Sequence, residues 1–257
     1  MCFSKDEKYL YAASNAGSII VWDVHHQRVL LTWKEHLSQC TALSSMDNPA
    51  TGQHILVSGS NDTKIKIWDL RSKSSASTLR GHDKPITDVK ISSSANQQYN
   101  DLFLVSSATD CYIKTWDFKS CKQISQLRHG SSSVQTLGIL TNEKKLISGH
   151  SDRHLRIWDL NKSKILSTTP SDSTICQKLV PHGSKYILSG LNDQIKIYDT
   201  TTSSVCDTVL KPPGNILDMA VSKGQRSKLI VTEYSIANKS VVLSFMPTRL
   251  LDIEEEE

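Results

Sequence analysis

The sequence predicts an all-β fold assembled from one unit that repeats along the chain. Five stretches share a turn, an alternating segment and a closing aromatic residue followed by aspartate; these aromatic residues are Trp22, Trp68, Trp116, Trp158 and Tyr198. Their spacings of 46, 48, 42 and 40 residues are nearly even, and a period of this length indicates a repeat architecture. No stretch shows sustained helical periodicity, which leaves strands as the repeated element.

The alternation inside each stretch is typical of a β-strand. In the second stretch, Ile65 and Ile67 alternate with Lys64 and Lys66, so that side chains of two kinds point to opposite faces. Turns rich in Ser, Asn, Asp and Gly separate these segments throughout the chain. Each stretch therefore predicts a strand, a tight turn and a second strand.

The repeats "GSNDTKIKIWDL" and "GHSDRHLRIWDL" resemble those of a known family, the WD-repeat (WD40) β-propellers. The family signature is a Gly-His pair and a Trp-Asp pair in repeats of about 40–45 residues. The first pair is present as Gly81-His82, altered to Glu35-His36 and inverted as His129-Gly130. The resemblance covers almost the whole chain and implies a β-propeller of four-stranded antiparallel blades, of which about six are visible.

On this resemblance we expect one propeller domain over 1–250, followed by an acidic tail over 251–257. The expected blades cover about 1–33, 34–80, 81–127, 128–170, 171–211 and 212–250. The first blade has a clipped innermost strand, and the last has no Trp-Asp pair, although "TRLLDI" offers it an outer strand. Because most family members close with seven blades, we expect a fragment missing about one N-terminal blade; an open ring is the alternative.

The resemblance also implies a structural hydrogen-bond network inside the blades. The indole N–H donates to a serine, the serine to an imidazole and the imidazole to an aspartate, which also caps the turn. The expected sets are His36, Ser58, Asp62 and Trp68; His82, Ser106, Asp110 and Trp116; Ser148, Asp152 and Trp158 with His129 as a displaced partner; and Ser189, Asp193 and Tyr198. The first blade has Ala12 and Ala16 instead, so we expect the second and third blades to be the most rigid.

Serine, histidine and aspartate together also suggest a hydrolase. A catalytic triad has no reason to recur at a fixed period, whereas a structural tie does. The chain also has no Gly-x-Ser-x-Gly nucleophile motif. We therefore expect no catalytic residues and no enzymatic activity.

The amino-acid composition excludes several further functional classes. The 257 residues carry a net charge of +4, which is too mild to indicate direct nucleic-acid binding. The six cysteines are scattered singly, as reduced core thiols of a cytoplasmic or nuclear protein are. No signal peptide, 18-residue apolar run, phosphate loop or metal-ligand cluster stands out, so we expect no membrane partner, cofactor, metal or small-molecule substrate.

These observations predict a non-enzymatic scaffold or adaptor that binds other proteins through loops on the propeller rim. Rigid blades with variable loop residues suit recognition, and the role itself follows from the resemblance. The turns next to the network present the expected partner-binding residues, which are Ser14, Asn15, Ser60, Asn61, Thr109, His150, Ser151, Leu191 and Asn192.

The subfamily and the pathway stay open. "GSIIVWD", "TKIKIWDL" and "NILDMAV" resemble the non-catalytic WD-repeat subunit of katanin, which implies a microtubule-associated role. "NDLFLVSSATDCYIKTWDF" and "KIYDTTTSS" resemble a WD-repeat subunit of the small-subunit processome, which implies an RNA-associated role in ribosome biogenesis. A substrate receptor of a ubiquitin ligase is the third alternative, because such receptors share the fold.

Overall fold

The computed structural model describes residues 1–4, 6–48, 53–92, 102–140, 144–170, 175–182, 186–191, 194–202, 204–210, 215–221, 228–235 and 240–247. Every regular element within these ranges is a β-strand, which confirms the predicted all-β class. Within them there is no apolar helix long enough to cross a membrane. Two compact units, Met1–Val134 and Gln135–Glu257, are described separately, and the single domain over 1–250 stays a prediction.

The first unit contains three four-stranded antiparallel sheets, each with its strands in sequence order. The first sheet is β1 (Cys2–Phe3), β2 (Tyr9–Ala13), β3 (Ser18–Asp23) and β4 (Arg28–Lys34). The second is β5 (Cys40–Asn48), β6 (Gln53–Ser60), β7 (Ile65–Asp69) and β8 (Ser75–Leu79). The third is β9 (Ile86–Ile91), β10 (Phe103–Ala108), β11 (Tyr112–Asp117) and β12 (Gln123–Arg128). The first strand of the first sheet is only two residues long, in line with the predicted clipped blade.

The second unit repeats this plan. One sheet is β13 (Val134–Leu140), β14 (Lys145–His150), β15 (His154–Asp159) and β16 (Lys164–Pro170). The next is β17 (Lys178–His182), β18 (Tyr186–Gly190), β19 (Ile195–Asp199) and β20 (Ser204–Leu210). The last has three strands, β21 (Asn215–Val221), β22 (Lys228–Ser235) and β23 (Ser240–Pro247). The outer strand expected from "TRLLDI" and the acidic tail lie outside the described residues.

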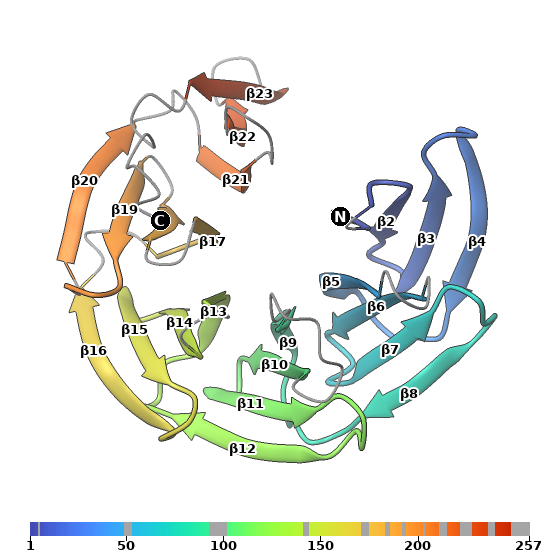
Figure 1. Ribbon diagram of the computed structural model, residues 1–257, viewed down its shortest axis with the longest axis horizontal. Helices are drawn as coiled ribbons and strands as arrows, with labels where there is room; N and C mark the ends of the chain where they lie inside the picture. The colour runs from blue at the N-terminus through green and yellow to red at the C-terminus, as the bar shows by residue number, and fades with distance from the viewer. Residues whose placement is uncertain are drawn as a thin grey trace. The chain divides into compact units, whose positions relative to one another are not determined.

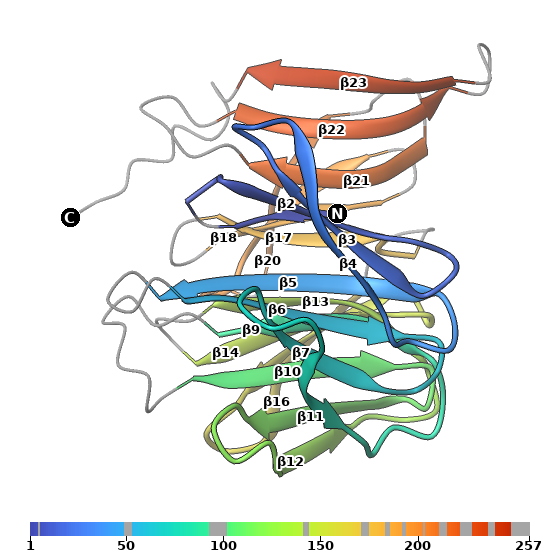
Figure 2. The same ribbon diagram turned by 90° about the vertical axis from the view of Figure 1, so that its right-hand side faces the viewer.

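Neighbouring strands of each sheet are antiparallel, so successive connections between them lie at opposite ends of a unit. In the first unit, β5 and β9 lie close together while β8 and β12 lie at the outer edge (Figure 1). Figure 2 shows β5, β7 and β10 running across this unit from one end to the other. We call the end with the β6–β7 and β10–β11 turns the network end, and the end with the β7–β8 and β11–β12 turns the opposite end.

The hydrophobic cores lie between neighbouring sheets within each unit. In the first unit, Tyr11, Ile19 and Val21 of the first sheet pack against Leu56 and Trp68 of the second. The second sheet packs on the third in the same way, and the second unit has two equivalent clusters. A central strand is therefore covered on both faces, which is why all four residues from Ile65 to Trp68 are buried. Buried β-branched side chains on both faces favour this strand-rich packing.

The turn between β2 and β3 requires a glycine. Gly17 has φ +78°, and a Cβ there would lie 2.6 Å from the carbonyl oxygens of His36 and Ser38. Gly130 also has a left-handed φ of +69°, but nothing lies within 4 Å of its Cβ position. A side chain at Gly17 would therefore meet both backbone strain and a steric collision, whereas one at Gly130 would meet backbone strain alone.

We expect Gly17→Ala to lower the free energy of unfolding by about 2 kcal/mol, because it combines a left-handed φ with a collision against backbone atoms. Gly130→Ala should cost about 1 kcal/mol, since it adds only the left-handed strain. Equilibrium urea unfolding measures both values. Equal losses in the two variants would show that the close approach to His36 and Ser38 does not constrain this turn.

Candidate functional site: the polar network and the turns beside it

The second sheet carries a continuous chain of buried polar side chains. Trp68 Nε1 donates to Ser58 Oγ at 2.8 Å, and Ser58 Oγ lies 2.7 Å from His36 Nε2. His36 Nδ1 lies 2.9 Å from the Oδ2 of Asp62. The four residues come from β7, β6, the β4–β5 connection and the β6–β7 turn, so the chain connects four separate segments.

The aspartate at the end of this chain fixes the backbone around it. Asp62 accepts hydrogen bonds from the backbone N–H groups of Leu37 and Lys64, both at 3.0 Å. Burial alone would raise the pKa of the Asp62 carboxyl, but the hydrogen bonds from Leu37, His36 and Lys64 hold it below its ordinary value. The carboxylate therefore stays ionised at neutral pH and holds the turn against the β4–β5 connection.

The histidine is neutral in this arrangement. Burial lowers the pKa of His36, and the hydrogen bond to Asp62 opposes this only in part. A neutral ring that donates from Nδ1 to Asp62 has its lone pair on Nε2, where it accepts from the Ser58 hydroxyl. Every donor in the chain thus meets an acceptor, from the indole to the carboxylate.

The third sheet repeats the set with the same connections. Trp116 Nε1 donates to Ser106 Oγ at 2.8 Å, and His82 contacts Ser106 through Nε2 at 2.8 Å. His82 Nδ1 lies 2.7 Å from Asp110, whose carboxylate also accepts from the backbone N–H of Tyr112 at 3.0 Å. The structure thus brings together all eight residues of the two sets.

The fourth set is connected differently, and the prediction for His129 is wrong. The His129 side chain is exposed, and Ser148 instead contacts Nε2 of His150 at 2.8 Å while accepting from Trp158 at 2.7 Å. Asp152 forms a bidentate pair with Arg156. The cause is the position of the histidine: His150 lies two residues after the serine on β14, so its ring reaches Ser148 from the same strand.

The fifth set has a thiol beside its serine. Cys176 Sγ lies 3.0 Å from Ser189 Oγ, and burial raises the pKa of this thiol to about 12. Tyr198 is buried at the position that tryptophan has in the other sheets. Asp193 lies outside the described residues. No sequence pattern predicts Cys176 at this place, because the spacing of this repeat differs from the others.

The residues expected to face a partner divide into two groups. Asn15 is exposed, and Ser14, Asn61, Thr109 and Ser151 are half-buried in the turns. Three predicted positions, Ser60, His150 and Leu191, are buried, so the prediction that they face a partner is wrong. Asn192 lies outside the described residues.

Each buried position has a local cause. Ser60 accepts from the backbone N–H of Asp62 and donates to the carbonyl of Ser38, both at 3.1 Å, so its hydroxyl shapes the turn. His150 is turned inward by Ser148. Leu191 belongs to the apolar cluster between two sheets of the second unit. Alternation along a strand does not reveal such inward positions at the strand end.

Basic side chains opposite the network serines were missed by sequence reasoning. Lys66, Lys114, Arg156 and Lys196 are register partners of Ser58, Ser106, Ser148 and Ser189, and all four are buried. Lys66 Nζ lies 2.9 Å from Glu35, whose carboxylate also accepts from Ser75; although burial opposes it, these bonds lower the pKa of Glu35 to about 2. The recurrence of Lys or Arg two residues before four of the five aromatics was the available signal.

The aspartate that follows each aromatic also has a local role. At the opposite end of the first unit, Asp69 accepts from the backbone N–H of Arg71 at 3.0 Å, and Asp117 accepts from that of Lys119 at 2.7 Å. Asp159 and Asp199 do the same in the second unit. These carboxylates cap the β-turns after the third strand of four sheets, and in the second, third and fourth repeats the other aspartate accepts from a backbone N–H in the turn at the other end of the strand.

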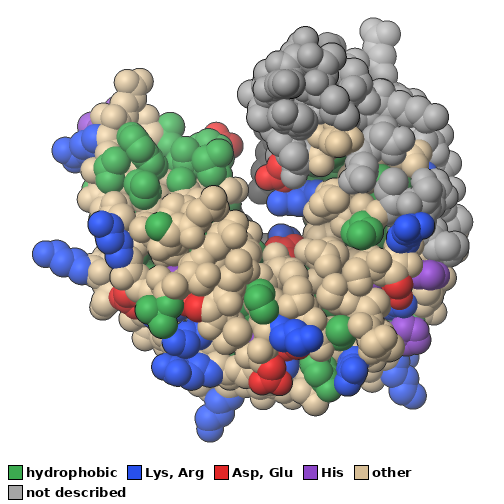
Figure 3. Space-filling view, turned by 180° about the vertical axis from the view of Figure 1, so that it is seen from behind, with side chains coloured by type: hydrophobic (Ala, Val, Ile, Leu, Met, Phe, Trp, Pro, Cys, Tyr) green, Lys and Arg blue, Asp and Glu red, His purple; other side chains and the backbone are tan. Residues whose placement is uncertain are grey.

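The first sheet lacks the network, as expected, and its tryptophan is different. Trp22 is 38% exposed, whereas Trp68 is 1% exposed and stacks on Trp33 with ring centroids 4.8 Å apart. Val24, Val29 and Leu30 are also exposed, and Figure 3 shows hydrophobic side chains gathered over this sheet. The same sequence position is thus a core residue in one sheet and a surface residue in another.

Comparison with known proteins accounts for this repeated geometry. The family model described as "WD domain, G-beta repeat" matches residues 1–23, 27–69, 73–117 and 121–159. Similar proteins include autophagy-related protein 16 of Arabidopsis thaliana, 24% identical over 84% of this chain and 33% of that protein. Nuclear distribution protein PAC1 of Arthroderma otae is 25% identical over 79% of this chain and 49% of that protein.

Human protein NEDD1 is 27% identical over 88% of this chain and 35% of that protein. The chain therefore spans between a third and a half of the length of these relatives. Since the relatives are of varied kinds, they leave the subfamily unresolved. The matched repeats cover more than half of the chain, and the chain belongs to the WD40 repeat family.

Proposed function

We propose that the protein is a non-enzymatic interaction scaffold that binds partner proteins through the turns at the network end of its sheets. Members of the WD40 family typically act as protein-interaction scaffolds, and this is the first support. The second is local: Asp62 and Asp110 hold the two turns that carry Asn61 and Thr109. Binding residues placed on rigid turns lose little conformational freedom on association.

The arrangement of the serines argues against hydrolysis. A serine nucleophile has to reach its substrate, but Ser58 and Ser106 are both 0% exposed. Each hydroxyl oxygen also accepts an indole N–H at 2.8 Å, which holds the side chain in the buried network. The same set occurs in two sheets, as a structural element would. The absence of catalysis is therefore part of the proposal.

Three settings follow from the sequence resemblances, and they differ in the partner that would be captured. A katanin-like role predicts a microtubule-severing subunit, a processome-like role predicts ribosome-assembly proteins with RNA, and a ubiquitin-ligase role predicts ligase subunits. Figure 3 shows acidic and basic side chains mixed on the face that it presents, which favours a protein surface over a nucleic-acid backbone. We propose the cytoplasm or nucleus as the compartment, because the described cysteines are free thiols.

Affinity capture of the tagged chain with mass spectrometry tests the proposal. We expect a stable set of proteins that is lost at least tenfold when Asn61→Arg and Thr109→Arg are combined, because both residues lie in turns at the network end. Ser74→Arg with Ser120→Arg is the matched control, since these exposed residues lie in turns of the same two sheets at the opposite end. Recovery of no stable partner by the folded protein, or equal losses in both variants, would refute the proposal.

A further inference from the structure

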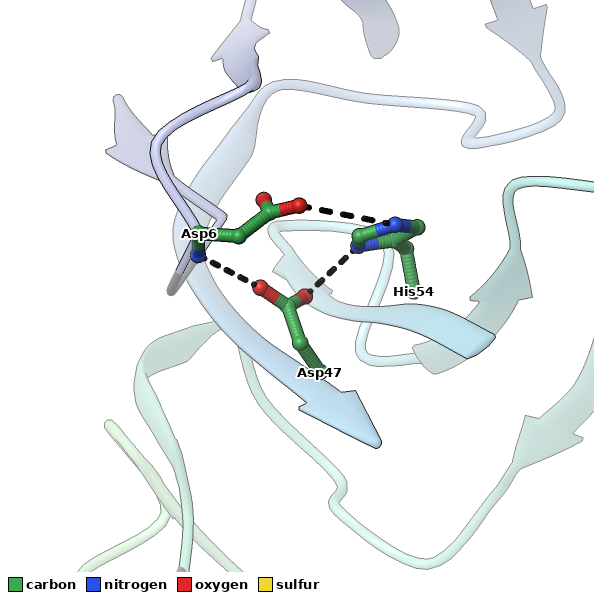
Figure 4. A group of neighbouring side chains, drawn as sticks. All are labelled: Asp6, Asp47 and His54. Atoms are coloured by element: carbon green, nitrogen blue, oxygen red, sulfur yellow. Dashed lines mark hydrogen bonds and ion pairs between the residues drawn. The ribbon is translucent and has the colours of Figure 1, made fainter. Parts of the chain in front are cut away.

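Three metal-ligating side chains meet where the first two sheets of the first unit adjoin. Asp6 lies in the β1–β2 turn, Asp47 near the end of β5 and His54 near the start of β6, and their ligand atoms lie within 4.8 Å of one another. Figure 4 shows the imidazole with one nitrogen toward each carboxylate. The sequence does not reveal this group, because the three residues lie on separate segments with no motif spacing.

Asp47 is held in place by its neighbours. It is the register partner of His54 on the β5–β6 pair, and its Oδ1 lies 3.0 Å from His54 Nδ1. Its other oxygen accepts from the backbone N–H of Asp6 at 3.0 Å. A carboxylate that accepts from Nδ1–H places the lone pair of a neutral imidazole on Nε2. His54 thus presents a ligand nitrogen toward Asp6.

In the neutral tautomer that donates from Nδ1 to Asp47, the lone pair on His54 Nε2 faces the Asp6 carboxylate across a gap. His54 Nε2 and Asp6 Oδ2 are 3.9 Å apart, which is too long for a hydrogen bond. The Asp6 carboxylate is held in place by hydrogen bonds from the Ser4 hydroxyl at 2.7 Å and from the backbone N–H of Lys8 at 3.3 Å. A lone pair opposite a carboxylate is stabilised by a cation between them. Zinc bonds to nitrogen and oxygen of about 2.0–2.2 Å would span this gap after a small approach of the two groups.

The surroundings support the ring and leave the gap accessible. The edge of Tyr9 packs on His54 with ring centroids 4.9 Å apart and an interplanar angle of 77°. Lys8 Nζ lies 3.1 Å from Asp6 Oδ2, but the lysine side chain is 69% exposed and can move into solvent when a metal ion competes for that oxygen. Solvent at this partly exposed site can supply the remaining ligands.

We propose that His54 and Asp6 bind a divalent transition-metal ion of the zinc class, with Asp47 as the residue that positions the imidazole. Imidazole nitrogen and carboxylate oxygen suit Zn²⁺, and a carboxylate on the second ring nitrogen is the usual support for a histidine ligand. The ion joins the β1–β2 turn of the first sheet to β6 of the second. Its role is structural: it fixes the two-residue strand β1 and the turn that follows.

Isothermal titration of the full chain with ZnCl₂ tests the site, together with thermal unfolding in zinc and in EDTA. We expect His54→Gln and Asp6→Asn to weaken one zinc-binding event at least tenfold and to abolish the rise in Tm that zinc causes. The exposed Asp6 makes the second variant mild, and an unchanged Tm in EDTA shows that it folds. His26→Gln is the matched control, because His26 has the same contact with one aspartate, Asp23, at 2.8 Å.

The role of Asp47 has its own readout. Asp47→Asn keeps an acceptor for the ring N–H but removes the charge, so the visible absorption of bound Co²⁺ should shift, whereas His26→Gln should leave it unchanged. Zinc binding that is equal in all the variants would overturn the proposal, because the ion would then bind elsewhere, for example at cysteines. Absence of any zinc-dependent rise in Tm in the unaltered chain would overturn it as well.

Discussion

Trp68→Ala is expected to lower the free energy of unfolding by about 4 kcal/mol, the range found for removing a large buried aromatic side chain. Trp68 is 1% exposed, stacks on Trp33 at an interplanar angle of 23°, and packs against Leu56 between the first two sheets. Its loss leaves a cavity and also removes the donor to Ser58. Guanidinium unfolding followed by near-ultraviolet circular dichroism measures the change.

Trp22→Ala is the matched control, because Trp22 occupies the same place in its own repeat and is 38% exposed. We expect a loss of about 1 kcal/mol, in the range of substitutions outside a core. If the two variants lost equal stability, the position of the tryptophan in the repeat would matter more than its packing. That result would contradict the assignment of Trp68 to the core between two sheets.

Asp62→Ala is expected to cost about 3 kcal/mol, the upper end for leaving buried donors without an acceptor. The substitution removes the acceptor of three groups: the ring of His36 and the backbone N–H groups of Leu37 and Lys64. The folded pKa of Asp62 is lowered, so its contribution is complete above its unfolded pKa and is lost as pH falls through the folded value. The difference in the free energy of unfolding between the unaltered chain and Asp62→Ala should therefore become smaller at acidic pH.

Asp69→Ala is the control for Asp62→Ala, because Asp69 also caps a turn but pairs with the exposed Arg71. An exposed ion pair contributes little, so we expect a loss of about 1 kcal/mol or less. Urea unfolding at neutral and acidic pH distinguishes the two. If Asp62→Ala left the stability unchanged but abolished a chemical activity, the interpretation as a hydrolase would replace the structural one.

The sequence alone was sufficient to predict the repeated sheets and two of the polar hydrogen-bond sets. The even spacing of Trp68 and Trp116 predicted sheets that the structure contains, because an aromatic residue closing an alternating segment fixes where a strand ends. The sets around Ser58 and Ser106 could be predicted because each has its histidine at nearly the same distance before the serine, 22 and 24 residues. Comparing two repeats showed which histidine belongs to which serine, and a single repeat would not have shown this.

The predictions from sequence fail where a repeat departs from that spacing, or where the backbone conformation determines which way a side chain points. In the fourth repeat the histidine follows Ser148, so only the structure shows that His150 turns inward and that Asp152 pairs with Arg156. Ser60 is buried because its hydroxyl satisfies the turn backbone, which polarity alone does not indicate. Asp6 and His54 meet through packing between two sheets, and no local pattern encodes such a contact.

The central claim is that the repeated polar chain holds the turns of the second and third sheets rigid for recognition. Amide hydrogen exchange, resolved residue by residue, measures this directly at Leu37 and Lys64, which donate to Asp62, and at Tyr112, which donates to Asp110. We predict that these amides exchange more slowly than that of Ser18, which donates to the Ser14 hydroxyl in the first sheet, where the polar chain is absent among the described residues. Exchange at all four positions at the same rate would contradict the claim.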